Sequence, residues 1–371
     1  MGESYKYWLA NLNEIGTREK IQLKEIFGSE EEIYRAVEYP KRMPDMISQD
    51  TKERLQKGKR EKAWENAYEE FRKKGVRLVC YQDPDYPKQL AEIHDPPYCL
   101  YVKGKLPPQS QKIVGVVGAR NCSAYGRTVA ENIGKELALH GVGVVSGLAY
   151  GIDAAAHHGA LSGGGDTYAI LGCGVDVCYP TANRELYQRI DGSGGIVSEY
   201  FMGCPPKKEL FPHRNRIISA LAEALIVVEA KRRSGSLITA DRALEQGKAV
   251  YAVPGRISDS LSYGTNWLLS QGAAPFFSME EFLKDMGISG EEMGLHKKLI
   301  EFPLEKNERL VYSVLDLTPQ HLESVIEKTG LTFADVLRGL AGLQKRGYVK
   351  EIYKNHYIRT NWTFDANEEK S

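Results

Sequence analysis

The chain of 371 residues carries 49 Lys and Arg against 49 Asp and Glu, so its formal net charge is zero and bulk charge indicates no partner. It holds no apolar run of the ~20 residues that a membrane helix needs, and its first residues lack the apolar core of a secretory signal. Its six cysteines are scattered and form no C-x-x-C pair. We therefore expect a cytoplasmic protein of two or three domains with reduced cysteines and no membrane contact.

The first 75 residues have the pattern of a compact, highly charged helical unit. In "YWLANLNEIGTREKIQLKEIFGSEEEIYRAV" apolar residues recur at helical spacing, and the pattern breaks at Gly16 and Gly28. The stretch "KERLQKGKREKAWENAYEEFRKKG" indicates a further helix with solvent-facing charges. The sequence therefore predicts an N-terminal helical domain over residues 1–75.

After Gly75 the sequence predicts short strands and proline turns, followed by apolar runs that each end in or near glycine or serine. Helical patterns separate these runs. Continuous Val/Ile runs that alternate with helices are typical of a parallel sheet covered on both faces. We expect an α/β domain with a Rossmann-like, doubly wound parallel sheet over residues 76–288. The predicted strands span residues 113–118, 141–147, 167–172, 195–200, 224–230 and 249–255.

The C-terminal part reads as a linker followed by a second small domain. Residues 289–304 are a plausible linker. The next segment predicts a helix, a helix from about Pro319, a turn at Gly330, a helix from Thr332 to Arg346 and a short hairpin after Gly347. This order resembles a winged helix-turn-helix over residues 305–362. We expect the tail, residues 363–371, to be disordered.

Basic and small residues follow the predicted strands. Because ligands of open parallel sheets bind beyond the carboxyl ends of the strands, we expect a site there. Arg120 follows the first run, beside Ser123, which could cap the next helix, and Tyr125, which adds an aromatic face. Lys231–Arg233 precede a Gly/Ser turn into another helix. Free N–H groups at helix starts attract anions, so these loops predict an electropositive pocket.

"FPHRNRIISAL" (211–221) adds Arg214 and Arg216 to that pocket. We expect the helix to start after Pro212, so that both arginines lie at the start of the helix. Bases there are unfavourable unless an anion is bound, and a guanidinium can bind phosphate with two hydrogen bonds. The alternative is that both arginines pair with carboxylates such as Glu199 or Glu223.

No catalytic constellation emerges. The chain lacks both the G-x-G-x-x-G fingerprint of dinucleotide-binding proteins and the G-K-[ST] ending of a Walker loop. Asp153 and His157 share a helical face and could bind a metal, but a lone pair without a third ligand is more often structural. Cys173 and Cys178 fit packing better than nucleophilic chemistry. We expect no enzyme, no cofactor and no bound metal.

The motifs resemble one known family over about 200 residues. They stand in that family's order and include "VGVVGARNCSAYG", "VVSGLAYGIDAAAHHGAL", "AILGCGVDVCYP", "FPHRNRIISALAEALIVVEA" and "SGSLITADRALEQGKAVYAVPG". On these stretches the chain is similar to the DNA-processing protein A (DprA/Smf) family. The helical start, taken as SAM-like, and the winged-helix end resemble the accessory domains of many members.

The resemblance implies a function that spacing alone did not reveal. Members of the family bind single-stranded DNA with little sequence preference, form homodimers through the α/β domain and help load the RecA recombinase during natural transformation. The family is not known for an enzymatic reaction. Phe211 is a plausible platform for base stacking, and buried packing is its alternative. The positions carried over are Gly118, Arg120, Ser146, Gly147, Phe211, Arg214, Asn215, Arg216, Lys231, Gly235 and Ser236.

Two other functions remain open from the residues. The α/β core also resembles nucleotide-phosphate hydrolases with a P-G-G-x-G-T-x-x-E motif, but "RRSGSLITADRALEQG" has no glutamate at the motif spacing. A protein-binding adaptor, in which the basic loops pair internally, is the other alternative.

Overall fold

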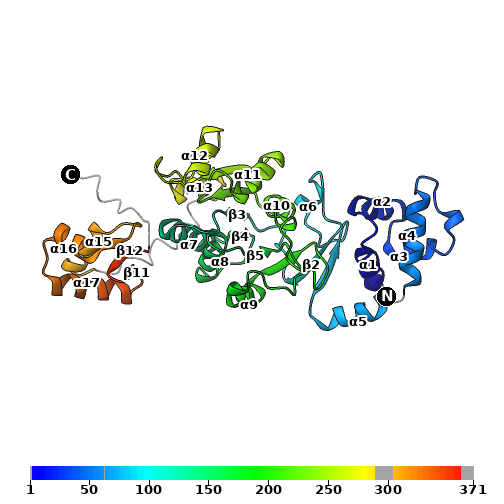
Figure 1. Ribbon diagram of the computed structural model, residues 1–371, viewed down its shortest axis with the longest axis horizontal. Coiled ribbons are helices and arrows are strands. Elements are labelled where there is room, and N and C mark those ends of the chain that lie inside the picture. Colours follow the sequence, from blue (N-terminus) through cyan, green and yellow to red (C-terminus); the bar gives the residue numbers. More distant parts are fainter. Residues whose placement is uncertain (1, 62, 289–303, 361–371) are drawn as a thin grey trace.

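The computed structural model describes residues 2–61, 63–288 and 304–360, in three parts that follow one another along the molecule (Figure 1). Helices at the N-terminal end pack around Trp8, Leu9, Ile33 and Leu55, which are fully buried. Ser29 and Ser48 cap the starts of two of them through their hydroxyl groups. The helices are α1 (Gly2–Ala10), α2 (Thr17–Phe27), α3 (Glu30–Ala36), the 3-10 helix η1 (Pro40–Arg42), α4 (Gln49–Arg60) and α5 (Ala63–Lys73).

A nine-stranded sheet with the order β1-β2-β6-β5-β4-β3-β7-β8-β9 forms the central part. The strands from β6 to β9 in this order pair in parallel, whereas β1–β2 and β2–β6 pair antiparallel. The predicted mostly parallel α/β sheet is therefore confirmed. The strands are β1 (Arg77–Cys80), β2 (Cys99–Gly104), β3 (Ile113–Val117), β4 (Gly143–Ser146), β5 (Thr167–Ile170), β6 (Gly195–Ser198), β7 (Ala224–Val227), β8 (Ala249–Ala252) and β9 (Ala274–Pro275).

Helices cover both faces of this sheet. Leu90, Ile217 and Ala240 pack on one face, and Ile133 and Phe282 pack on the other. Strands buried on both faces explain why their sequences are continuous apolar runs. The helices of this part are α6 (Lys88–Ala91), α7 (Ala124–Leu139), α8 (Ile152–Ser162), the 3-10 helix η2 (Thr181–Asn183), α9 (Arg184–Ser193), α10 (Leu210–Leu221), α11 (Gly235–Glu245), α12 (Tyr263–Ser270) and α13 (Met279–Asp285).

The C-terminal part has its own apolar cluster, which includes Val311, Val325 and Leu340. Gly330 ends one helix in the left-handed conformation and Thr332 caps the next, as the sequence predicts. Its assignment as a winged helix remains a prediction. The elements are α15 (Lys306–Val314), β10 (Gln320–His321), α16 (Leu322–Thr329), α17 (Phe333–Lys345), β11 (Val349–Tyr353) and β12 (His356–Arg359), with the sheet order β10-β12-β11.

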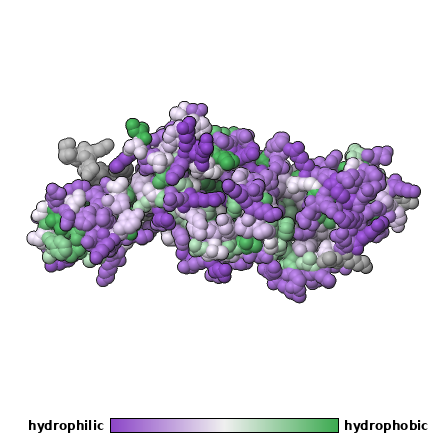
Figure 2. Space-filling model, in the orientation of Figure 1, coloured by the Kyte–Doolittle hydropathy of each residue, from purple (hydrophilic) through white to green (hydrophobic). Residues whose placement is uncertain are grey.

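The visible surface is mainly hydrophilic, with a hydrophobic area at the end where α16 and α17 lie (Figure 2). Among the described residues, no helix combines the length and the apolar character needed to cross a bilayer. Residues 289–303 of the predicted linker and the predicted tail, residues 363–371, lie outside the described residues.

Candidate nucleic-acid interface

The carboxyl ends of the parallel strands form one edge of the sheet, which we call the carboxyl edge. The chain leaves β3 toward β4 and β5 on one side, and β7 pairs with β3 on the other. The strand order therefore reverses between β3 and β7. Doubly wound sheets bind ligands at such a point, so the loops that follow these strands are where a site is expected.

Arg120 lies exposed at this edge, in the loop after β3. Its guanidinium carbon is 5.3 Å from the centre of the Phe211 ring, a distance at which a cation is attracted to an aromatic face. Gly118 starts the loop, and a Cβ there would lie 2.6 Å from Ile152 Cγ1. Within the described part of the chain Arg120 forms no ion pair, so its charge is available to a ligand.

Ser146, the last residue of β4, and Gly147, which follows it, are buried. Ser146 is fully buried and its hydroxyl donates to the carbonyl oxygen of Val116 at 2.6 Å. The Gly147 N–H donates to Asp153 Oδ2 at 3.1 Å. A Cβ at Gly147 would collide with the guanidinium group of Arg214. Both residues therefore support the loop after β4 from its buried side.

Arg214 is buried, with 4% of its surface exposed. Its Nη1 donates to the carbonyl oxygens of Gly147, at 3.0 Å, and of Ile170. Burial lowers the pKa of Arg214 to about 10, and nearby Asp153 opposes that shift. The side chain is still charged at neutral pH and joins the carboxyl ends of β4 and β5.

Arg216 is 5% exposed and fully paired within the chain. Its guanidinium donates to both carboxylate oxygens of Glu199, at 3.1 and 2.7 Å, and to Asp95 Oδ2 at 3.2 Å. His213 reaches the same two carboxylates at 3.0 and 3.3 Å. Its hydrogen bond to Glu199 raises the pKa of His213. For Arg216 the alternative stated from the sequence therefore applies: the side chain pairs with a carboxylate of the chain, and that carboxylate is Glu199.

The helix that carries these arginines starts earlier than the sequence predicts. α10 begins at Leu210, so Pro212 lies in its first turn and not at the end of the incoming loop. Proline fits there because the first N–H groups of a helix have no partner within it. The prediction that Arg214 and Arg216 lie at the start of the helix is therefore wrong. They lie one turn inside it and point into the protein.

Phe211 and Asn215 connect α10 to its neighbours. The half-buried Phe211 ring lies over Gly172 and 5.6 Å from the ring centre of Tyr179. Asn215 accepts from Arg214 Nε at 3.2 Å and donates to the carbonyl oxygen of Gly235 at 3.4 Å. α10 therefore brings the loop after β3 and the start of α11 to one place.

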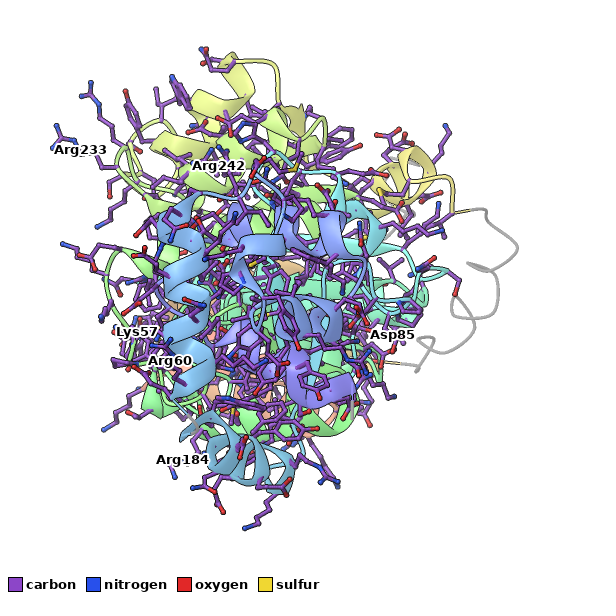
Figure 3. The ribbon with its side chains drawn as sticks, turned by 90° about the vertical axis from the view of Figure 1, so that its right-hand side faces the viewer. Lys57, Arg60, Asp85, Arg184, Arg233 and Arg242 are labelled. Carbon is purple, nitrogen blue, oxygen red and sulfur yellow. The ribbon has the colours of Figure 1, made fainter. Side chains whose placement is uncertain are left out.

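The loop after β7 is basic and exposed. Lys231, Arg232 and Arg233 form no ion pair within the described residues, and Arg233 points away from the body of the molecule (Figure 3). Gly235, the first residue of α11, is also exposed. Ser236 is buried, and its N–H donates to the capping hydroxyl of Ser234 at 3.4 Å.

Sequence reasoning missed Glu229, which stands between β7 and the basic loop. Its carboxylate accepts from the N–H of Ser123 at 2.9 Å and from the Ser123 hydroxyl. Ser123 caps α7 as predicted, because its Oγ accepts from Gly126 N at 2.9 Å. A Cβ at Gly126 would collide with the Glu229 carboxylate. An internal anion thus already occupies the start of α7.

The other candidate side chains from the sequence are buried or half-buried, and their contacts are with the protein itself. His157 Nδ1 lies 2.7 Å from Thr167 Oγ1, and burial lowers its pKa to about 3. Asp153 Oδ2 accepts from the N–H of Gly147. Burial raises the pKa of the Cys173 thiol to about 12, and the half-buried Tyr125 packs on the apolar core. In the described ranges no His, Cys, Asp and Glu side chains cluster as metal ligands.

Comparisons with known proteins agree on one family. Residues 77–287 match the family model of the DNA recombination-mediator protein A. The chain is 46% identical over 203 residues to the DNA processing protein DprA of Streptococcus pneumoniae, covering 55% of this chain and 72% of the relative. It is 36% identical over 287 residues to the protein Smf of Escherichia coli, covering 74% and 75% of the two chains.

Two solved structures are similar as well. The X-ray structure of DprA from Streptococcus pneumoniae superposes with a TM-score of 0.58 at 35% identity, covering 76% of this chain and 98% of that one. DNA processing protein A of Helicobacter pylori, described for its single-stranded DNA binding mode, gives a TM-score of 0.51 at 31% identity, covering 57% and 95%.

Proposed function

Because the chain belongs to the DNA recombination-mediator protein A family, we propose that it binds single-stranded DNA at the carboxyl edge of its sheet, without strong sequence preference. The observation that carries this proposal is Arg120, an exposed cation without an ion pair in the described chain, stacked against Phe211 at the point where the strand order reverses. Cations contact phosphates and aromatic rings stack on bases, and neither contact reads sequence.

The predicted site residues divide into two groups by burial. Arg120, Phe211, Asn215, Lys231 and Gly235 are accessible in full or in part. We propose that Arg120 and Lys231 bind phosphates, and that Phe211 stacks on a base. Ser146, Gly147, Arg214, Arg216 and Ser236 are buried, and with Gly118 we propose that they hold the loops in shape.

The family is the basis for the remaining proposals. We propose that the protein loads RecA onto the strand and acts as a homodimer, without an enzymatic reaction. We further propose that the N-terminal helices form a SAM-like domain over residues 1–75, that residues 76–288 form the DNA-binding domain, and that residues 305–362 form a winged-helix domain.

Fluorescence anisotropy of a labelled single strand, measured at several salt concentrations, tests the site. We expect Arg120→Ala to weaken binding by about tenfold or more, because a hydrogen bond to a charged group is lost. The slope of log K against log salt should fall by about 0.7 for one phosphate contact. Arg35→Ala is the control, since Arg35 pairs with Glu31 and Glu32 on the surface of α3. No binding by the wild type, or equal loss in both variants, contradicts the proposal.

A further inference from the structure

Three exposed aromatic side chains follow successive strands along the carboxyl edge. Tyr150 follows β4, Tyr179 follows β5 and Phe201 follows β6, and they are 48%, 41% and 41% exposed. Phe is among the residues most often buried, and Tyr is intermediate. Three of them in a row on one edge therefore indicate a ligand with flat apolar surfaces.

Hydrogen bonds join the three loops into one rim. Asn183 Nδ2 donates to the carbonyl oxygen of Leu148 at 2.9 Å, which ties the Tyr150 loop to the Tyr179 loop. The N–H of Gly203 donates to Asp176 Oδ1 at 2.7 Å, which ties the Tyr179 loop to the Phe201 loop. The rim is therefore fixed before any ligand binds, which lowers the entropic cost of binding.

Phe211 links this rim to the basic half of the edge. Its ring lies 5.6 Å from Tyr179 on one side and 5.3 Å from the Arg120 guanidinium carbon on the other. In sheet order the basic loops follow β7 and β3, and the aromatic loops follow β4, β5 and β6. With strands ~4.8 Å apart, this edge runs for roughly 20 Å.

Cations also accompany the aromatic half. Arg184 and Lys207 are exposed and form no ion pair in the part of the chain that the structure describes, although Glu185 and Glu209 lie near them in sequence. Arg233 follows β7 and Arg184 follows β5, and both lie on the same side of the molecule (Figure 3). Phosphates of one strand could therefore meet cations in both the basic and the aromatic half.

We propose that Tyr150, Tyr179 and Phe201 are further base-stacking residues, so that a bound single strand runs along the carboxyl edge from the loop after β7 to the loop after β6. This inference rests on the proposed function and adds a path to it. Stacking residues tolerate every base, so the path keeps the absence of sequence preference.

Two probes of equal length and charge test the path by fluorescence anisotropy: a labelled thymidine strand and the same strand with abasic sites. We expect Tyr179→Leu to weaken binding of the thymidine strand by about 5- to 100-fold, the range for one lost stacking contact. The same variant should bind the abasic strand as the wild type does. Tyr179→Phe should retain both affinities, and Tyr150→Leu and Phe201→Leu should behave like Tyr179→Leu.

Tyr39→Leu is the matched control, because Tyr39 is exposed in the N-terminal helical part, far from the edge in sequence. Thermal melts should show that every variant stays folded. Wild-type binding that the rim variants leave unchanged, or reduce equally for both strands, overturns the stacking path while the proposed function stands. Failure of the wild type to bind either strand overturns the proposed function itself.

Discussion

Arg216 is the residue whose surroundings differ most from what its sequence context suggests. It lies buried between Glu199 and Asp95, and the Glu199 side chain is buried too. Removing one partner of a buried ion pair leaves an uncompensated charge and costs about 3–5 kcal/mol. We therefore expect Arg216→Ala to lower the free energy of unfolding by about that amount, measured by urea denaturation.

The double variant Arg216→Met with Glu199→Leu distinguishes pairing from ligand contact. Replacing both charges by apolar side chains should recover much of the stability, because no buried charge is left alone. If Arg216→Ala instead keeps its stability and loses only DNA binding, the side chain contacts the strand directly. His213 contacts both carboxylates in the wild type, and in the double variant it keeps only its contact with Asp95.

Local patterns at single residues predicted well where the partner is close in the sequence. The Ser123 cap, three residues from Gly126, follows from the sequence and is confirmed. The partners of Arg216 lie 17 and 121 residues away, so the sequence could name Glu199 only as one alternative beside Glu223. In the sequence, two arginines near a proline give the same pattern whether they bind a phosphate of a ligand or a carboxylate of the protein.

At the scale of one element, the start of α7 depends on Glu229. Its carboxylate holds both the N–H and the hydroxyl of Ser123. We expect Glu229→Ala to destabilise the protein by about 1–3 kcal/mol, because it leaves the two part-buried donors of Ser123 without their partner. Glu229→Gln should lose less, because its amide oxygen can still accept from the N–H. Chemical denaturation measures both, and equal stability of all three proteins would contradict this role.

Glu229 also bears on the alternative of a nucleotide hydrolase. Doubly wound folds commonly hold a nucleotide phosphate at the helix start that follows the first strand of the parallel sheet. Here that place is taken by a carboxylate of the chain itself, and Gly126 leaves room for nothing larger than a hydrogen. A second anion there would face direct charge repulsion. This start of α7 therefore disfavours a nucleotide phosphate at that place.

Whole strands were predictable from the sequence because their burial on both faces requires continuous apolar runs. The six predicted runs correspond to β3 to β8, and each strand ends one to three residues before its run does. The first turn of α10 was missed because Pro212 looks like a boundary. Tyr150, Tyr179 and Phe201 could not be identified in advance, since the sequence does not tell an exposed Tyr179 from a buried Tyr168.

At the scale of the molecule, a partly buried charge network joins the N-terminal helices to the sheet. Asp83, in the loop after β1, binds Lys6 of α1 at 2.7 Å and Lys24 of α2 at 3.3 Å, and Lys24 also binds Glu30 at 2.7 Å. The two parts share one apolar cluster as well. The helices and the sheet should therefore unfold together in the wild type.

Asp83→Asn should uncouple them, because it removes the charge that two lysines share. We expect a loss of about 1.5–3 kcal/mol, the range for hydrogen bonds to a charged group. In a background with Trp267 and Trp362 replaced by Phe, the fluorescence of Trp8 and Trp64, in the N-terminal helices, should then change at lower urea than the far-UV circular dichroism of the whole chain. Asp85→Asn is the control: Asp85 lies on the same loop but is exposed (Figure 3), and its pair with Arg77 is superficial. Coincident transitions in Asp83→Asn would mean that the shared apolar cluster alone couples the two parts.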